Sequence, residues 1–194
     1  LYGPSIRAGD QLSRTPTLLA LQELDLQYTS LTDTDYQVLG SRFPNVRAIN
    51  LAPHEAEPPL TLEVVKSFPN LAKLTCASRL LTESGVALLV HAPQLKTLEL
   101  IGYSGDDTIE RLQPLSGKLE TLGLYRMPIE GATPLSRRSF EIIAQFHQLG
   151  YLGFHGTYGS PTDADLRLLV TLPRLRALSC GFPVESPYPL FPES

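Results

Sequence analysis

A six-residue pattern, L-x-x-L-x-L, recurs along the chain at a nearly constant spacing. Its copies are LQELDL from Leu21, VRAINL from Val46, LAKLTC from Leu71, LKTLEL from Leu95, LETLGL from Leu119, LGYLGF from Leu149 and LRALSC from Leu175. The successive offsets are 25, 25, 24, 24, 30 and 26 residues. Seven copies at this period indicate a repeat protein, in which each unit adds one similar element to a stack.

The segments between the copies have a different pattern. Their apolar residues recur at helical spacing, as in Tyr36, Leu39 and Phe43, in Val64, Val65 and Phe68, and in Val86, Leu89 and Val90. Each unit is therefore predicted to be a short strand followed by a helix.

Start and stop signals frame these predicted helices. Thr32 with Asp35, and Thr162 with Asp165, have the spacing of a capping box, which satisfies free N–H groups at a helix start. Proline disfavours helical geometry in the residue before it. Four helices are therefore predicted to end at Pro44, Pro69, Pro93 and Pro173.

Together these features resemble leucine-rich repeat proteins. The LTD sequence at residues 31–33 and the FPN sequences at 43–45 and 68–70 resemble the long-repeat subgroup of ribonuclease inhibitor and F-box-associated repeats. The resemblance implies an α/β fold, a right-handed solenoid (horseshoe) with a concave parallel sheet and convex helices. One departure is that the ladder position, usually Asn or Cys in this family, is occupied by Thr29, His54, Arg79, Tyr103, Met127 and Thr157.

Curvature follows from two spacings. Paired strands lie about 4.8 Å apart, whereas packed helices need about 8–10 Å, so the strands are expected on the inner side. Residues between the leucines then face the concavity in three columns. The columns are Glu23, Ala48, Lys73, Thr97, Thr121, Tyr151 and Ala177; Asp25, Asn50, Thr75, Glu99, Gly123, Gly153 and Ser179; and Gln27, Ala52, Ala77, Ile101, Tyr125, His155 and Gly181.

These columns supply the candidate binding residues. Rigid aromatic side chains beside glycines, in the C-terminal half, are interpreted as a docking pocket for a partner. The longest unit adds residues around 127–138, and such insertions often lie on a binding face. The candidates are Tyr125, Arg126, Tyr151, His155 and Tyr158, with Asp25, Gln27, Lys73 and Glu99 in the polar N-terminal half. The alternatives are ordinary decoration of an exposed sheet and a drifted loop without a role.

Residues that could indicate catalysis or metal binding have simpler explanations. Cys76 and Cys180 both occupy a leucine position and are expected to face the core. They lie four strands apart, roughly 19 Å, whereas a disulfide needs Cα atoms within about 7 Å. A triad of Ser179, His155 and Asp25 fails because Asp25 is five strands from His155.

Asp106 and Asp107 form an acidic pair that could suggest a cation site. The preferred interpretation is that they cap a helix starting near Thr108. No catalytic set, metal site or cofactor is therefore expected, and the protein is predicted not to be an enzyme.

Composition restricts the partners. The 194 residues carry a net charge of −4 and no basic cluster beyond Arg137 and Arg138, so neither nucleic acid nor a membrane surface is expected as a partner. No run of apolar residues is long enough for a membrane span, and no secretory signal is visible. Two core thiols and no signal fit a reducing cytoplasm.

The ends of the chain differ from the repeats. Residues 1–6 align with the end of a strand, with a first helix expected from Gln11 to Leu19, so residues 1–182 are interpreted as about seven repeats plus a partial N-terminal one. This suggests a fragment of a longer protein. Residues 183–194 are rich in proline and are interpreted as a C-terminal cap, with a linker as the alternative.

The function predicted from these features is a protein-interaction module that binds a protein or peptide. Two alternatives remain open. One is the substrate-recognition part of an F-box-type ubiquitin ligase, which the family resemblance implies. The other is a regulatory or sensor region of a larger enzyme whose catalytic domain is not in this chain.

Overall fold

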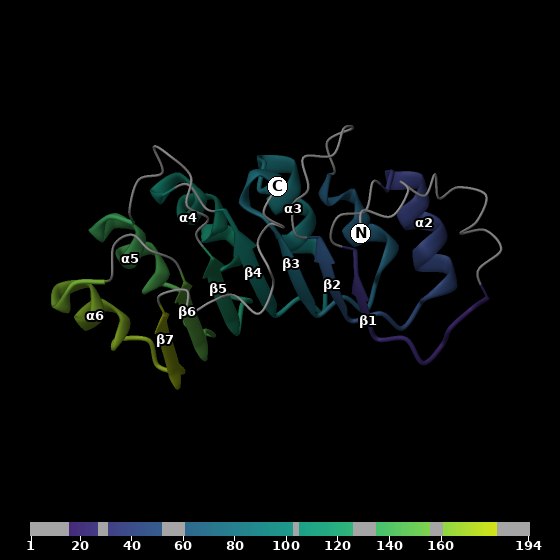
Figure 1. The fold of residues 1–194 in the computed structure, drawn as a ribbon. Helices are drawn as coiled ribbons and strands as arrows, with labels where there is room; N and C mark the ends of the chain where they lie inside the picture. Colours follow the sequence, from purple (N-terminus) through teal and green to yellow (C-terminus); the bar gives the residue numbers. More distant parts are fainter. Residues whose placement is uncertain are drawn as a thin grey trace, which may run out of the picture.

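Seven parallel strands form one sheet in the order of the sequence, β1 to β7 (Figure 1). The computed structural model describes residues 16–26, 31–51, 61–102, 105–125, 135–155 and 161–181, apart from the Asp33 side chain. The strands are β1 (Glu23–Asp25), β2 (Ala48–Leu51), β3 (Lys73–Ala77), β4 (Thr97–Ile101), β5 (Thr121–Tyr125), β6 (Tyr151–His155) and β7 (Ala177–Gly181). Each strand coincides with one copy of the leucine pattern, so the repeat predicted from the sequence is confirmed.

Helical segments follow the strands and lie over one face of the sheet (Figure 1). They are α2 (Asp33–Arg42), η1 (Leu62–Ser67), η2 (Ser78–Leu80), α3 (Glu83–His91), α4 (Asp106–Leu112), η3 (Gln113–Leu115), α5 (Arg137–Ile143) and α6 (Asp163–Leu169). The unit after β2 forms a 3₁₀ helix, η1, rather than the α-helix predicted. Val64 and Val65 lie side by side in this short helix, and β-branched residues have lower α-helical propensity.

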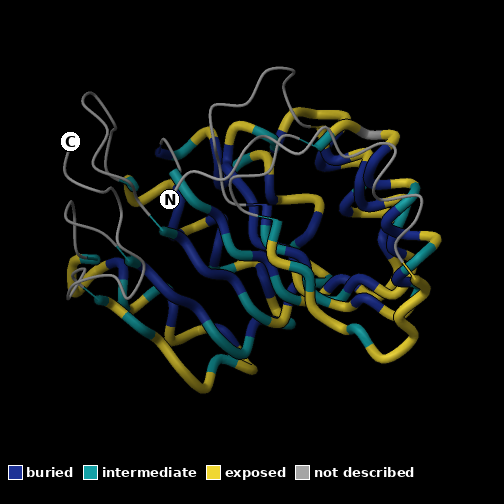
Figure 2. Tube along the Cα trace, turned by 45° about the vertical axis from the view of Figure 1, so that its right-hand side comes forward, coloured by how far each residue is buried: buried dark blue, intermediate teal, exposed yellow. Residues whose placement is uncertain are grey.

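The pairing register confirms how the side chains are arranged. Leu74 pairs with Leu98, Leu98 with Leu122 and Leu122 with Leu152, and all four side chains are fully buried. The leucine positions therefore form a continuous core between the sheet and the helical layer (Figure 2). A single unit could not bury its apolar side alone, so stability depends on the stacking of neighbours.

Hydrogen bonds at helix starts match the sequence signals. Thr32 with Asp35, and Thr162 with Asp165, both form complete capping boxes. The proline prediction holds for three helical segments, which end two residues before Pro44, Pro69 and Pro93. It is wrong for α6, which ends at Leu169, four residues before Pro173.

Neighbouring units are also joined by a polar ladder at the turns that precede the strands. Asn45 donates to the Leu19 carbonyl at 2.8 Å, and Asn70 donates to the Pro44 carbonyl at 3.0 Å. At the corresponding position two units later, the Lys118 ammonium donates to the carbonyls of Leu89, Val90 and Ala92. These side chains therefore add hydrogen bonds that tie each turn to carbonyl groups of a preceding unit.

Several predictions are wrong in detail. Residues 16–19, the described part of the helix predicted from Gln11 to Leu19, are not helical, and Leu18 and Leu19 are exposed. Val90, which was grouped with the apolar residues at helical spacing, is also exposed. Cys180 takes the leucine position in β7 but is exposed, because β7 lies at the edge of the described sheet. The 183–194 segment and the ladder positions other than Arg79 lie outside the described residues.

Asp106 has a different role from the one predicted. Helix α4 begins at Asp106 itself, after Gly105, and the Asp106 carboxylate does not cap it. Instead the carboxylate accepts hydrogen bonds from the Ser136 amide at 2.8 Å, from the Ser136 hydroxyl and from the Ser139 hydroxyl at 2.5 Å. Asp106 therefore joins α4 to the start of α5 in the next unit.

This contact predicts a pH-dependent stability. Partial burial acts to raise the pKa of Asp106, but the hydrogen bonds from Ser136 and Ser139 and the nearby Arg138 outweigh it and lower the pKa. Because the pKa of Asp106 is lowered in the fold, its ionised carboxylate stabilises the protein at pH values above the ordinary carboxyl pKa of about 4. This stabilisation is lost as the pH falls through the pKa of the folded state. The melting-temperature advantage of wild type over Asp106→Asn should therefore narrow between pH 6 and pH 3. A constant advantage over that range would contradict this account.

Candidate functional site

The face of the sheet away from the helices carries the three columns predicted from the sequence. The register aligns Lys73, Thr97, Thr121, Tyr151 and Ala177 in one column, Thr75, Glu99, Gly123, Gly153 and Ser179 in the second, and Ala77, Ile101, Tyr125, His155 and Gly181 in the third. With Glu23, Asp25, Ala48 and Asn50 of β1 and β2, these residues are called the open face below. Gln27, Arg126 and Tyr158, which are candidates from the sequence, lie outside the described residues.

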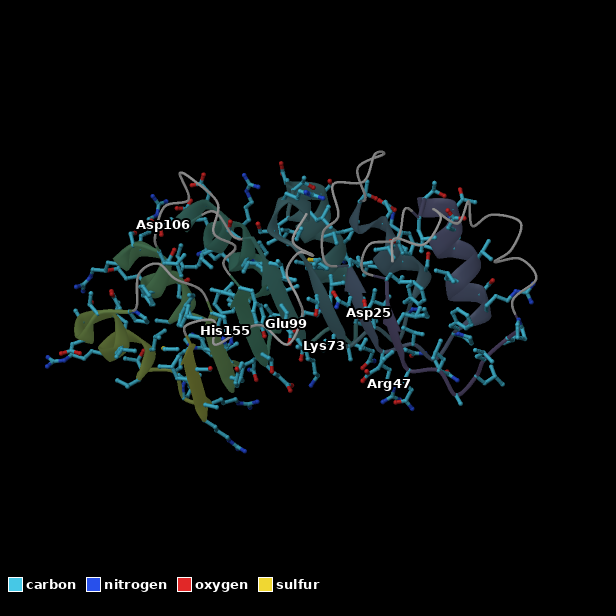
Figure 3. All side chains as sticks on the ribbon, in the orientation of Figure 1. Asp25, Arg47, Lys73, Glu99, Asp106 and His155 are labelled. Atoms are coloured by element: carbon cyan, nitrogen blue, oxygen red, sulfur yellow. The ribbon has the colours of Figure 1, made fainter. Side chains whose placement is uncertain are left out.

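The charged candidates on the open face are engaged with their neighbours. Lys73 and Glu99 form an ion pair across β3 and β4, with 2.9 Å between Lys73 Nζ and Glu99 Oε1. The Thr75 hydroxyl donates to the other Glu99 oxygen at 2.8 Å. The charges of Lys73 and Glu99 therefore neutralise each other. Asp25 lies further along the sheet, on β1 (Figure 3).

The aromatic candidates meet on β5 and β6. The Tyr125 and His155 rings are stacked, with 4.6 Å between their centroids and 12° between their planes. Tyr125 pairs with His155 in the register, and Tyr151 lies four residues before His155 on the same strand. The structure thus brings together three of the residues singled out in the sequence. Asp25 and Lys73 lie on β1 and β3, away from these rings, whereas Glu99 on β4 borders them, since a Cβ atom at Gly123 would lie 3.2 Å from Glu99 Cγ.

Glycines let these rings lie close to the sheet. A Cβ atom at Gly153 would lie 2.9 Å from His155 Nε2 and 3.1 Å from the Tyr151 hydroxyl oxygen. A Cβ at Gly123 would lie 3.0 Å from the Tyr125 ring, and one at Gly181 would lie 3.2 Å from His155 Nδ1. Any larger residue would push the rings away from the backbone. We call Tyr125, Tyr151 and His155, over Gly123, Gly153 and Gly181, the aromatic platform.

The platform differs from the pocket predicted from the sequence. Gly123 and Gly153 are buried although they lie on the open face, because the rings cover them. The rings occupy the space that the small residues were expected to leave. The result is a stacked pair, in which the Tyr125 and His155 rings each cover one face of the other.

His155 adds an unusual feature. Its Nε2 atom is buried and has no hydrogen-bond partner among the residues that the structure describes. Leaving a buried polar group unpaired costs about 1–3 kcal/mol.

The platform rests on a packed support. Phe154, between Gly153 and His155, points to the core and contacts Phe140 of α5, with 5.6 Å between ring centroids. Leu122, Leu124 and Leu152 of the same two strands are fully buried. The alternation of core and open-face residues along a strand therefore fixes the direction of the aromatic side chains.

Sequence columns identified the platform residues but missed two contacts. Tyr125 stacks on His155 because the two residues are direct neighbours in the register. Their consecutive positions in the third column were the sequence signal for this contact. Likewise, Lys73 and Glu99 lie in adjacent columns on adjacent strands. Opposite charges at such diagonal positions are a signal for an ion pair.

Groups suited to metal or redox chemistry do not gather in the described part of the chain. No cluster of three or more His, Cys, Asp or Glu side chains that could hold a metal occurs among the described residues. Burial raises the pKa of the Cys76 thiol to about 12, which disfavours the reactive thiolate at neutral pH. Among the helices described, none is long and apolar enough to cross a membrane.

Comparison with known proteins informs the fold. No protein-family model matches the sequence, and no curated protein matches it. A chain in the crystal structure of the yeast Rad7 and Elc1 complex matches at 15% identity with a TM-score of 0.55, covering 82% of this chain and 42% of that chain. This chain thus spans less than half of that relative, and at this identity the likeness supports a repeat-like α/β fold alone.

A second solved structure is a weaker match. The tropomodulin C-terminal domain of Caenorhabditis elegans matches at 12% identity with a TM-score of 0.41, covering 72% of this chain and 90% of that one. A match at this score carries no argument about function or fold.

Proposed function

We propose that the chain is a leucine-rich-repeat solenoid that binds a protein or peptide partner without catalysing a reaction. The observation that carries this proposal is the aromatic platform, where Tyr125 stacks on His155 over a floor of glycines. Large rigid aromatic residues contribute much of the binding energy in protein interfaces. A platform on the exposed side of a parallel sheet, which most proteins cover, is suited to this role.

Repetition supports the solenoid part of the proposal. Each described strand pairs only with its sequence neighbours, and the helical segments lie on the other side. Such stacks bind partners along an extended concave surface. Parts of the open face would then differ in role, with uncharged anchors on β5 and β6, Glu99 on the neighbouring strand β4, and Asp25 and Lys73 further toward β1.

A narrower proposal is that the partner is the substrate of an F-box-type ubiquitin ligase. The FPN sequences at 43–45 and 68–70 favour this class, and the repeat-like neighbour was solved as a complex with a second protein. A regulatory region of a larger enzyme is the third proposal and needs the same binding surface. We place the protein in the cytoplasm because Cys76 is a buried free thiol.

The test compares purifications from native lysate with two baits. One bait is the wild-type chain and the other carries Tyr125→Ala, Tyr151→Ala and His155→Ala together. We expect at least one protein to be recovered by wild type and lost with the triple variant, while the melting temperatures stay close because the three residues lie outside the leucine core. Equal recovery of every protein by both baits would exclude the aromatic platform as the binding site.

A further inference from the structure

We propose that residues 187–191, the sequence PYPLF, add to the outer edge of β7 as one further, antiparallel strand that closes this end of the stack. Within the described part of the chain, β7 pairs only with β6. An unpaired edge binds a strand of the same chain or of a second molecule. The segment follows β7 directly, so it reaches the edge at a far higher effective concentration than a second molecule does. The proposed function of the aromatic platform does not depend on this strand.

The first observation is the direction of the backbone groups of β7. Ala177 donates its N–H to the Gly150 carbonyl, in the turn before β6, at 3.2 Å. Successive residues of a strand turn their N–H and C=O groups to opposite sides. Leu178 and Cys180 therefore turn theirs away from β6, toward the edge. Both side chains are also exposed, although they occupy leucine positions. A strand added at this edge would pair with these backbone groups and cover these side chains.

The second observation is the spacing of the prolines that follow β7. Pro183, Pro187 and Pro189 are all separated by even numbers of residues, so in an extended chain their nitrogen atoms face the same side. A proline has no N–H group and is tolerated in an edge strand where this side faces solvent. The N–H groups of Tyr188 and Leu190 then face β7. The prolines on the outer side leave a new edge that pairs poorly with another molecule.

The third observation is the loop, which sets the register. A three-residue loop would commonly need a residue with positive φ, which Phe, Pro and Val at residues 182–184 disfavour. A five-residue loop at residues 182–186 is commonly built around a type I turn, whose second position favours proline. Pro183 has that position. The sequence therefore favours the five-residue loop.

This register matches apolar residues on the two strands. Leu190 lies opposite Leu178, and Tyr188 lies opposite Cys180. Directly opposite residues share one face of a sheet, so the Leu190 and Tyr188 side chains extend the leucine core past β7. A single added strand brings no helical layer with it, so the leucine positions of β7 stay less enclosed than those of the inner strands.

The fourth observation is charge. Arg174 and Arg176 are exposed, and their side chains form no ion pair with any residue that the structure describes. Residues 182–194 contain Glu185 and Glu193 and no basic residue. In the register above, Glu193 lies beside the two arginines. The segment and this end of the stack are therefore complementary in charge as well as in apolar side chains.

Amide hydrogen exchange, followed by NMR in the full chain, tests this strand. The amides of Leu178 and Cys180 should exchange within about tenfold of the rate of Ser179, whose N–H faces β6, whereas on an open edge they would exchange about 100-fold faster than Ser179. Leu190→Pro removes an N–H that faces β7 and should raise the Leu178 rate to that of an open edge. Phe191→Pro is the matched control, because the N–H of residue 191 faces solvent, and it should leave the rate unchanged.

Three results would overturn the inference. One is fast exchange of both the Leu178 and Cys180 amides in wild type, and another is an equal effect of Leu190→Pro and Phe191→Pro. The third is protection that disappears on dilution, which would assign the edge to a second copy of the chain. Recovery of a partner with the triple alanine variant reports on the aromatic platform alone, so the two proposals fail or hold separately.

Discussion

Leu122→Ala should lower the free energy of unfolding by about 3 kcal/mol, within the range of about 2–5 kcal/mol for buried leucines. Leu122 is the second residue of β5, is fully buried, and lies between Leu98 and Leu152 in the register. Its loss would leave a cavity shared by three units, which cannot collapse without moving neighbouring strands. Urea denaturation of the two proteins measures the difference.

Leu178→Ala is the matched control for this substitution. Leu178 has the same position in β7, two strands further on, but is 39% exposed. We expect it to cost less than about 1 kcal/mol because it removes fewer contacts and leaves no enclosed cavity. Equal losses from the two substitutions would mean that burial by neighbouring units is not what stabilises the leucine positions.

Tyr125→Ala should weaken binding of the partner identified with wild type about 30-fold, which corresponds to about 2 kcal/mol. The substitution removes one ring of the platform and also the ring on which His155 is stacked. Titration calorimetry with purified partner measures the affinity, and thermal melting of the free variant checks that the fold is kept.

Two further variants separate the contributions of Tyr125. Tyr125→Phe keeps the ring and should retain most of the affinity if stacking and packing carry the interaction. Thr97→Ala changes the open face on β4, outside the platform, and should change the affinity less than about twofold. An affinity unchanged in Tyr125→Ala, or lowered as much by Thr97→Ala, would argue against a platform-centred site.

The leucine pattern was enough to predict the strands, their parallel order and the columns of the open face. Each of these depends on the period of the sequence and on alternation along a strand, both of which are local properties. The helix starts at Thr32 and Thr162 were predictable for the same reason, because a capping box is formed by residues only three positions apart. The solenoid's handedness and membership of the leucine-rich repeat family stay predictions.

Contacts between units were harder to predict. Asp106 is the first residue of α4, yet its carboxylate accepts hydrogen bonds from Ser136 and Ser139 of the next unit, about 30 residues away. Cys180 occupies a leucine position, but its burial depends on what lies beside β7 rather than on its own strand. Sequence periodicity gives the direction of a side chain and does not give its neighbours across the stack.

The candidate site shows the same division. Tyr125, Tyr151 and His155 were identified from their columns, and the structure places them together. The collapse of their rings onto glycine depends on side-chain conformations, so the expected pocket became a platform. Likewise, no spacing in the sequence indicates that His155 Nε2 would be buried without a hydrogen-bond partner in the described part of the chain.

Photo-cross-linking tests most directly whether the partner binds at the platform. A photoreactive amino acid is placed singly at Thr121 or Ala177, which flank the platform, or at Val170, which is 78% exposed at the end of α6. The proposal predicts that the partner is cross-linked from Thr121 and Ala177 and not from Val170. Cross-linking from Val170 alone, or equally from all three positions, would contradict binding at the aromatic platform.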